Sequence, residues 1–284
     1  MTPLASAAGE SITYLEAIVL GVVQGLTEFL PISSSGHLRV VPALLGWGDP
    51  GASFTAVIQL GTMAAVVLFF WRDIVRIAAS WLRAIWTPAL RGTQDTRMGW
   101  YVILGTVPIV IFGVLFQDQI RTTARDLRII GVTLILLGIL LWAVDRFAPQ
   151  RKDLEALTLK DSLLFGLAQS LALIPGVSRS GATITAGRAL SFDRETAARF
   201  SFLLSIPAVV LSGLFEMKDV GGDGAVPWGP TIVATVVSFA VGYASIAWLL
   251  RWLVHHSMLV FGVYRVVLGV LVLVLVGTGV LAAT

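Results

Sequence analysis

The chain contains no cysteine, which excludes disulfide bonds and thiolate ligands for a metal ion. Charge is also scarce: Asp, Glu, Lys and Arg make up 13% of the 284 residues, whereas soluble domains carry about 25%. Hydrophobic residues make up 56% instead. These proportions exclude an ordinary soluble domain and indicate that lipid surrounds much of the chain. The sequence is therefore predicted to be an integral membrane protein.

The small excess of positive charge does not indicate a nucleic-acid partner. The formal net charge is +3, and the Arg residues are spread between apolar segments rather than gathered in one patch. This distribution suits the anionic headgroups of a membrane. We therefore expect membrane lipids, and no nucleic acid, as partners.

Apolar segments recur along the whole chain. Because about 20 apolar residues cross the hydrocarbon core of a bilayer, several of them have the length of a membrane helix, while others are shorter and broken by Gly, Pro and Ser. Their approximate ranges are 12–31, 53–71, 100–116, 129–144, 162–175, 200–215, 231–250 and 259–281. We predict a single all-α membrane domain over residues 1–284 with about eight apolar segments, of which about six span the membrane and two form broken, re-entrant helical hairpins.

Two of the broken segments align with each other without a gap at an offset of 145 residues. They are 21–38, GVVQGLTEFLPISSSGHL, and 166–183, GLAQSLALIPGVSRSGAT. The offset pairs residues of the same type: Gly21 with Gly166, Gln24 with Gln169, Leu26 with Leu171, Ser33 with Ser178, Ser35 with Ser180, and Gly36 with Gly181. This agreement predicts an internal duplication with halves at about 12–145 and 157–284.

The charges between segments predict that the two halves cross the membrane in opposite senses. Cytoplasmic loops collect Lys and Arg, and residues 72–97 hold five Arg. The corresponding residues 216–230 hold one Lys and three acidic residues, although the three Arg within 121–128 fit this scheme less well. We therefore predict an inverted-topology repeat, with a shared site where its broken segments meet.

The first broken segment carries charged and titratable groups inside an apolar context. Gln24 and Glu28 are four residues apart and share one helix face. Pro31 ends that helix, because it lacks a backbone donor, and the sequence SSSGH follows at 33–37. Non-helical backbone at membrane depth requires protein or a water-filled cavity around it. We interpret this segment as a polar re-entrant turn at a functional site.

The second broken segment, PGVSRSGAT at 175–183, places Arg179 among hydroxyls and unhindered backbone. Gly and Ser let backbone N–H groups converge on an anion, and the N-terminus of a following helix adds positive charge. A guanidinium binds phosphate oxygens through two parallel hydrogen bonds. The two segments together would form a pocket that can bind a diphosphate, hold a divalent cation and supply a nucleophile with its base.

These stretches resemble a known family. QGLTEFLPISSSGH and PGVSRSGAT are similar to the two signatures of the undecaprenyl-diphosphate phosphatase family of the bacitracin-resistance type, and SFTAVIQLG, RFSFLLSIPA and VYRVVLG extend the resemblance over nearly the whole chain. The resemblance implies an enzyme of the bacterial inner membrane that hydrolyses undecaprenyl diphosphate to undecaprenyl phosphate and phosphate. It further implies recycling of the lipid carrier for cell-wall synthesis, bacitracin resistance, a divalent cation (Mg²⁺ or Ca²⁺), and an active site open to the periplasmic face.

The resemblance also implies roles for individual residues. The catalytic set would be Glu28, Ser34, His37 and Arg179. The phosphate-binding set would be Ser33, Ser35, Ser178, Arg179, Ser180 and Thr183. Glu28 would hold the cation, and Gln24, which stands where many family members have Glu, is the weaker candidate for a second ligand.

The residues leave two questions open. The nucleophile is Ser34 with His37 as its base, a water activated by His37, or His37 itself. A transporter or flippase of lipid phosphates could use the same pocket, because inverted repeats with broken helices also support alternating access. Glu28 beside His37 favours the phosphatase, since transport of an anion has little need of a carboxylate next to the phosphate.

Four further expectations concern residues outside the two motifs. Arg188 and Arg199 are expected to contact lipid. Arg265 reaches either the headgroups or the pocket. His255 and His256 are expected to face solvent or headgroups. The glycines from Gly262 to Gly269 suggest a homodimer through a face of small residues.

Overall fold

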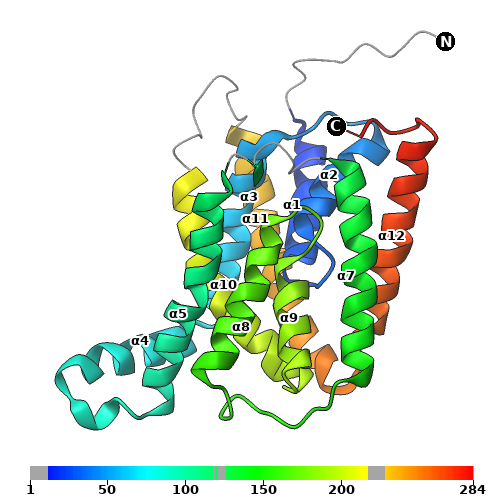
Figure 1. Ribbon diagram of the computed structural model, residues 1–284. Coiled ribbons are helices and arrows are strands. Elements are labelled where there is room, and N and C mark those ends of the chain that lie inside the picture. The colour runs from blue at the N-terminus through cyan, green and yellow to red at the C-terminus, as the bar shows by residue number, and fades with distance from the viewer. Residues whose placement is uncertain (1–11, 118, 121–125, 217–227, 284) are drawn as a thin grey trace.

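The computed structural model describes residues 12–117, 119–120, 126–216 and 228–283, and this part of the chain is helical without a β-strand (Figure 1). A helix lies on each predicted apolar segment, which confirms the all-α prediction. The helices are α1 (Tyr14–Phe29), α2 (Ser34–Leu45), α3 (Gly51–Phe69), α4 (Trp71–Trp86), α5 (Gln94–Leu115), α7 (Leu127–Phe147), α8 (Leu159–Ser170), α9 (Arg179–Ala189), α10 (Arg194–Glu216), α11 (Trp228–His255) and α12 (Leu259–Gly277).

Several helices have the length and composition of membrane crossings. α5, α7, α11 and α12 each meet both criteria, and α3 with α4 meets them as a pair bent by 71°. Large apolar side chains on these helices are exposed rather than buried, among them Val114, Leu136, Val236 and Val267. Such a surface is stable only in lipid, where apolar side chains need no cover. The chain is therefore a multi-pass membrane protein.

The two broken segments form hairpins that begin at opposite ends of the bundle. In Figure 1, α1 runs downward and α2 returns upward, whereas α8 runs upward and α9 returns downward. Both arms begin with the same cap, since Thr13 pairs with Glu16 and Thr158 with Asp161 in capping boxes. These caps also stand 145 residues apart, so the correspondence extends beyond the aligned motifs.

The turn of each hairpin has the same unusual backbone. Ser33 and Ser178 have φ angles of 76° and 69°, in the left-handed region that non-glycine residues rarely occupy. Each serine is the N-cap of the returning helix: the Ser33 hydroxyl accepts from the N–H of Gly36, and the Ser178 hydroxyl from the N–H of Gly181. The hydroxyl thus satisfies a backbone donor that water would otherwise have to reach.

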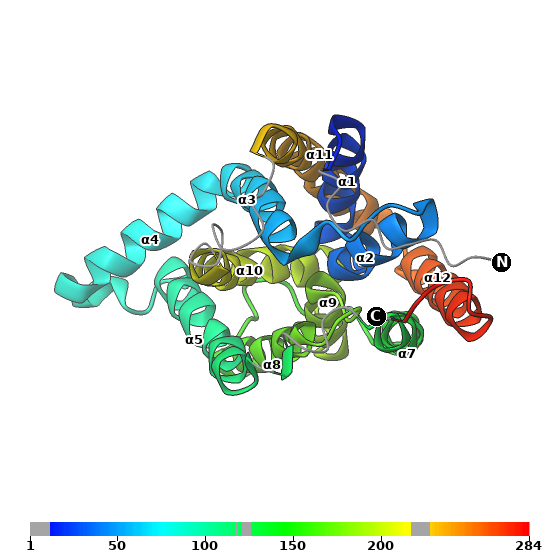
Figure 2. The ribbon, with the colours of Figure 1, turned by 90° about the horizontal axis from the view of Figure 1, so that it is seen from above.

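Aligned glycines let each arm pack closely on a helix of the other half. α1 packs along α11, and α8 packs along α5 (Figure 2). A Cβ atom at Gly21 would lie 2.6 Å from the carbonyl oxygen of Ala234, and one at Gly166 would lie 2.0 Å from that of Gly105. Any side chain at either position would collide with backbone. Glycine is therefore required at both positions for the same reason, which is the close approach of the facing helix.

The Arg-rich segment 72–97 is not the loop that the charge argument assumed. Most of it is helix α4, which lies beside the bundle at the lower end (Figures 1 and 2). Trp81 on α4 packs on Gly99 of α5. A helix with one charged face and one apolar face fits the membrane surface. Most of the contrasting segment, 216–230, lies outside the described residues. Arg121 and Arg125 also lie outside them.

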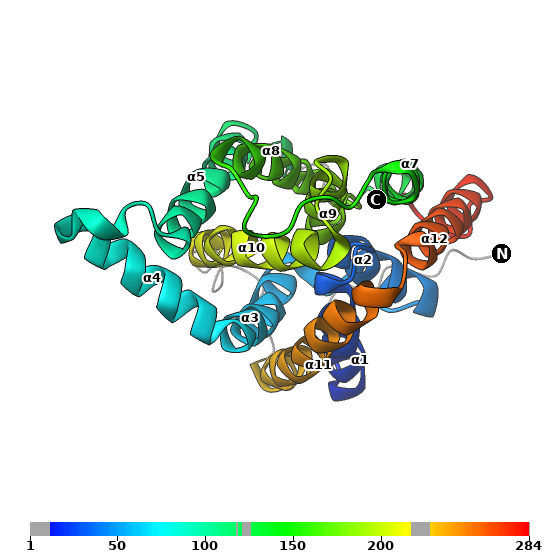
Figure 3. The same cartoon turned by 90° about the horizontal axis from the view of Figure 1, so that it is seen from below.

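The glycines proposed for a homodimer are used inside the chain. α12 packs along α7 at one edge of the bundle (Figure 3). Gly262 faces the carbonyl oxygen of Gly138, and Gly269 faces that of Gly131. This face of small residues is therefore covered by α7 and does not support a homodimer. The homodimer stays a prediction.

The expectation that Arg188 contacts lipid was wrong. Its side chain is fully buried and donates to Asp145 and to the carbonyl oxygens of Ala148 and Phe192. Arg199 is partly exposed and pairs with Asp73 of α4, so it is an anchor for that helix. Burial of Arg188 is tolerated because a carboxylate and several carbonyls surround it.

We predict that Gly166→Ala destabilises the protein, because the added methyl group would overlap the backbone of α5. Forced overpacking costs about 1–3 kcal/mol. Gly113→Ala on α5 is the matched control, since a Cβ atom there meets open space. Thermal unfolding in detergent should show a lower Tm for Gly166→Ala alone. Equal Tm values for the two variants would contradict the close approach of α8 and α5.

Candidate active site

Glu28 and Arg179 come together between the two hairpins. Glu28 lies in the last turn of α1, Arg179 is the first residue of α9, and Nη2 of Arg179 forms an ion pair with Oε1 of Glu28. The other carboxylate oxygen, Oε2, accepts from the Ser34 hydroxyl at 2.6 Å. The side chains of Glu28 and Arg179 are 7% and 17% exposed, so the ion pair is largely buried. Three of the four predicted catalytic residues are thus in direct contact.

Gln24 holds Glu28 from the preceding helical turn. Its Nε2 lies 3.2 Å from Oε2 of Glu28 and 3.3 Å from the hydroxyl of Thr62 on α3. Thr62 donates in turn to the carbonyl oxygen of Gln59 at 2.8 Å. In this arrangement the amide of Gln24 donates a hydrogen bond to the carboxylate of Glu28 and so orients it. Thr62 was not singled out from the sequence, where no motif marks it.

His37, the fourth predicted catalytic residue, has both ring nitrogens engaged. Nδ1 lies 2.7 Å from the carbonyl oxygen of Ser33, and a carbonyl can only accept, so Nδ1 carries the proton. In neutral His37, Nε2 then accepts from the hydroxyl of Tyr264 at 2.7 Å. The two rings are nearly parallel, at 7°. Because both nitrogens of His37 bond to other groups, the hydroxyl of Ser34 bonds to Glu28 and not to His37.

Arg265 joins the two turns. Its side chain is fully buried, Nη1 donates to the carbonyl oxygen of Pro31 at 3.2 Å, and Nη2 donates to those of Gly176 and Val177 at 3.1 and 2.9 Å. The sequence left open whether Arg265 reaches the headgroups or the pocket. Its buried guanidinium contacts the turns between the hairpin arms, so it does not reach the headgroups. Tyr264 and Arg265 both lie in the VYRVVLG stretch, whose resemblance to the family was the one signal that could have marked Tyr264.

The remaining hydroxyls of the two motifs mostly bind protein. Ser33 and Ser178 cap helices, and Ser180 donates to the carbonyl oxygen of Leu30 at 3.1 Å, which is a second link between the turns. Ser35 is exposed, whereas Thr183 is fully buried and bonded to Ser201 of α10. Contacts of this set with a phosphate stay predictions.

The site offers few ligands for a metal ion. No group of three His, Asp or Glu side chains converges in the part of the chain that is described. The two motifs contain a single acidic residue, Glu28. Mg²⁺ is often held by one or two carboxylates together with phosphate oxygens of the substrate. The residues present therefore fit a divalent cation that arrives with a diphosphate rather than one held by the protein alone.

Comparison with known proteins gives a consistent result. The model of the family described as bacitracin resistance protein BacA matches residues 17–271. A relative named undecaprenyl-diphosphatase from Nocardioides sp. is 57% identical over 273 residues, covering 96% of this chain and 100% of the relative. Proteins of the same name from Thermobifida fusca and Mycobacterium sp. are each 54% identical, covering 94% and 95% of this chain and 91% and 99% of the relatives.

We predict that Arg265→Lys lowers both stability and activity, although it keeps the positive charge. A lysine lacks the planar fork that serves carbonyls of both turns, and each buried carbonyl left unpaired costs about 1–3 kcal/mol. Arg251→Lys, at an exposed position, is the control. A Tm for Arg265→Lys equal to that of the control, measured in detergent, would contradict a role for Arg265 in joining the turns.

Proposed function

The chain belongs to the family of the bacitracin resistance protein BacA, and from this premise we propose that it hydrolyses undecaprenyl diphosphate to undecaprenyl phosphate and inorganic phosphate. The relatives named undecaprenyl-diphosphatase match it over nearly their full length. One observation carries the chemistry: a single carboxylate, Glu28, contacts both a hydroxyl that can attack phosphorus and a guanidinium that can bind phosphate. The reaction recycles the lipid carrier of cell-wall synthesis, and faster recycling gives bacitracin resistance.

In this proposal, Arg179 binds the terminal phosphate of the substrate. The guanidinium stands at the first residue of α9, where free backbone N–H groups and the helix dipole also favour an anion. The diphosphate takes over part of the pairing that Arg179 makes with Glu28 in the structure. Ser33, Ser35, Ser178, Ser180 and Thr183 line or support the turns around the phosphate.

Ser34 is the nucleophile and Glu28 is its base. The contact of 2.6 Å between Oγ of Ser34 and Oε2 of Glu28 provides the path for the proton. Oγ bonds to the terminal phosphorus, the proton goes to Glu28, and the bond to the bridging oxygen breaks, so undecaprenyl phosphate leaves with the electron pair. A water then displaces Ser34 from phosphorus. Glu28 returns its proton to Ser34, and one proton of the water passes to solvent.

His37 positions the nucleophilic turn in this scheme. Its Nε2 bonds to the hydroxyl of Tyr264, which fixes α2 against α12, and its Nδ1 bonds to the carbonyl oxygen of Ser33, the residue next to Ser34. A bound Mg²⁺ or Ca²⁺ would be held by Glu28 and by phosphate oxygens of the substrate. The cation supplies positive charge that offsets the charge of the diphosphate.

We further propose that the chain is an inverted repeat in one domain, with halves at about 12–145 and 157–284. α3, α5, α7, α10, α11 and α12 would be the six crossings, and the two hairpins would enter from opposite faces. Support comes from the matching caps, turns and glycines, and from the opposite directions of α1 and α8. α4 and the ends of α7 and α11 at the lower end of Figure 1 carry many of the Arg residues, which favours that end as cytoplasmic. The site would then open to the outer face of the inner membrane.

We predict that Ser34→Ala and Glu28→Gln each lower turnover by roughly 100- to 10,000-fold, because each removes one member of the nucleophile–base pair. Phosphate release from undecaprenyl diphosphate by purified protein, with Mg²⁺, with Ca²⁺ and with chelator, is the measurement. Glu195→Gln, an exposed acid, is the control. Mass spectrometry of acid-quenched native protein should reveal phosphate on Ser34.

Three outcomes would contradict the proposal at different levels. Full turnover by Ser34→Ala would exclude Ser34 as nucleophile and return that role to water or His37. Turnover unchanged by chelator would exclude the cation. Substrate binding without any hydrolysis by the native protein would exclude the phosphatase and favour the lipid-phosphate flippase.

A further inference from the structure

A polar pocket separate from the candidate active site lies at the C-terminal end of α7. It has a volume of about 300 Å³ and is formed by the end of α7, the segment after it, the first residue of α10 and the turn between α11 and α12. Its lining comprises Trp142, Asp145, Arg146, Ala148, Gln150, Arg194, Ser257 and Leu259. None of these residues belongs to the candidate active site.

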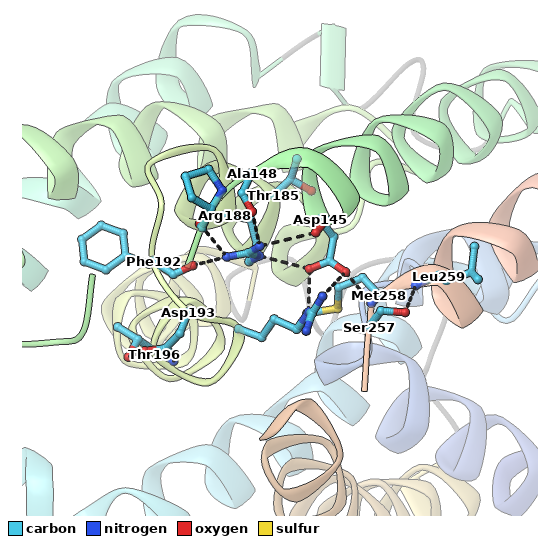
Figure 4. A network of polar contacts seen from close by, with 12 residues as sticks. Asp145, Ala148, Thr185, Arg188, Phe192, Asp193, Thr196, Ser257, Met258 and Leu259 are labelled. Carbon is cyan, nitrogen blue, oxygen red and sulfur yellow. Dashed lines mark hydrogen bonds and ion pairs between the residues drawn. The ribbon is translucent and has the colours of Figure 1, made fainter. Parts of the chain in front are cut away.

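The charge around this pocket is positive. Asp145 is buried and is shared by two guanidiniums: Arg188 donates to Oδ1 at 3.0 Å, and Arg194 donates to both oxygens at 2.7 and 3.0 Å. Asp145 also accepts from the N–H of Met258 at 2.9 Å (Figure 4). One carboxylate thus faces two guanidiniums, and the exposed Arg146 adds a third positive group. Asp145 is the single acid among the lining residues.

The walls of the pocket combine donors with apolar surface. Gln150 and Ser257 provide an amide and a hydroxyl beside the arginines. Two further lining residues are apolar: Trp142 and Leu259 are 40% and 44% exposed. Exposed apolar side chains continue from them along α7 and α12, including Ile139, Leu140, Val260 and Val263. A ligand that fits both parts has an anionic head and a long apolar tail.

The position in the bundle also indicates a lipid. The pocket stands where membrane helices end, and Trp is typical of that boundary. Basic pockets between membrane helices bind anionic headgroups, and a guanidinium matches phosphate oxygens in geometry as well as charge. Inorganic phosphate would use the arginines but would leave the apolar wall without a partner.

We propose that this pocket binds the phosphate of an anionic lipid headgroup, with Arg146 and Arg194 on the phosphate and the acyl chains against Trp142 and Leu259. The bound lipid would connect α7, α10 and the turn before α12, which are three of the four elements that Asp145 joins; the fourth is α9, through Arg188. This inference is independent of the proposed phosphatase activity, because it concerns other residues and needs no turnover.

The test is lipid binding by the full chain in detergent. Short-chain phosphatidylglycerol is titrated into native protein, Arg146→Gln and Arg251→Gln, and affinity is measured by native mass spectrometry and by the rise in Tm. Arg251→Gln removes the same charge from an exposed site that does not line the pocket. Arg146 is exposed and forms no ion pair among the described residues, so its variant should fold. Phosphatidylcholine of the same chain length and inorganic phosphate are the other two ligands.

We expect Arg146→Gln to bind phosphatidylglycerol about tenfold more weakly than native protein, since one charge-assisted hydrogen bond is lost, and Arg251→Gln to bind it unchanged. Phosphatidylcholine and inorganic phosphate should bind more weakly than phosphatidylglycerol to native protein. Equal affinity of the two variants would overturn the site. Inorganic phosphate that raises the Tm as much as phosphatidylglycerol at equal concentration would overturn the lipid as its ligand.

Discussion

Backbone that turns within a membrane must find hydrogen-bond partners inside the protein, and Arg265 supplies them for both turns at once. Its guanidinium binds carbonyl oxygens of Pro31, Gly176 and Val177, while Ser180 bonds from one turn to the other. Unpaired carbonyls in this environment would cost several kcal/mol each. Because these bonds hold the turns together, α1 can end and α9 can begin at the same place, and the charged residues at those ends can meet.

The two turns share a backbone but differ in the chemistry they carry. At the offset of 145 residues, Glu28 corresponds to Leu173, and Ser34 corresponds to Arg179. One turn therefore contributes the carboxylate and the hydroxyl, and the other contributes the guanidinium. The ion pair between Glu28 and Arg179 neutralises both charges in the absence of substrate. In the proposed reaction, a diphosphate replaces the carboxylate as the partner of Arg179, and Glu28 then becomes free to accept a proton.

The sequence was informative where local chemistry determines structure and less so where distant segments meet. Pro31 and the serine-rich stretches predicted the breaks, and the 145-residue offset anticipated the shared turn geometry at Ser33 and Ser178. The ring contact between His37 and Tyr264 spans 227 residues, so no local pattern could reveal it. For the same reason Arg188 was assigned to lipid, since its partner Asp145 lies 43 residues away. A charged residue near a helix end has the same local pattern whether it faces lipid or a buried acid.

The most direct test of the account is the affinity of a non-hydrolysable prenyl diphosphate analogue for native protein, Arg179→Gln and Glu28→Gln, measured in detergent with chelator present. If Arg179 exchanges Glu28 for the phosphate, Arg179→Gln should lose at least tenfold in affinity, as expected for one charge-assisted bond. Glu28→Gln should bind at least as tightly as native protein, because its guanidinium has no carboxylate to release. Unchanged affinity in Arg179→Gln would contradict the exchange and the role of the ion pair at the centre of the site.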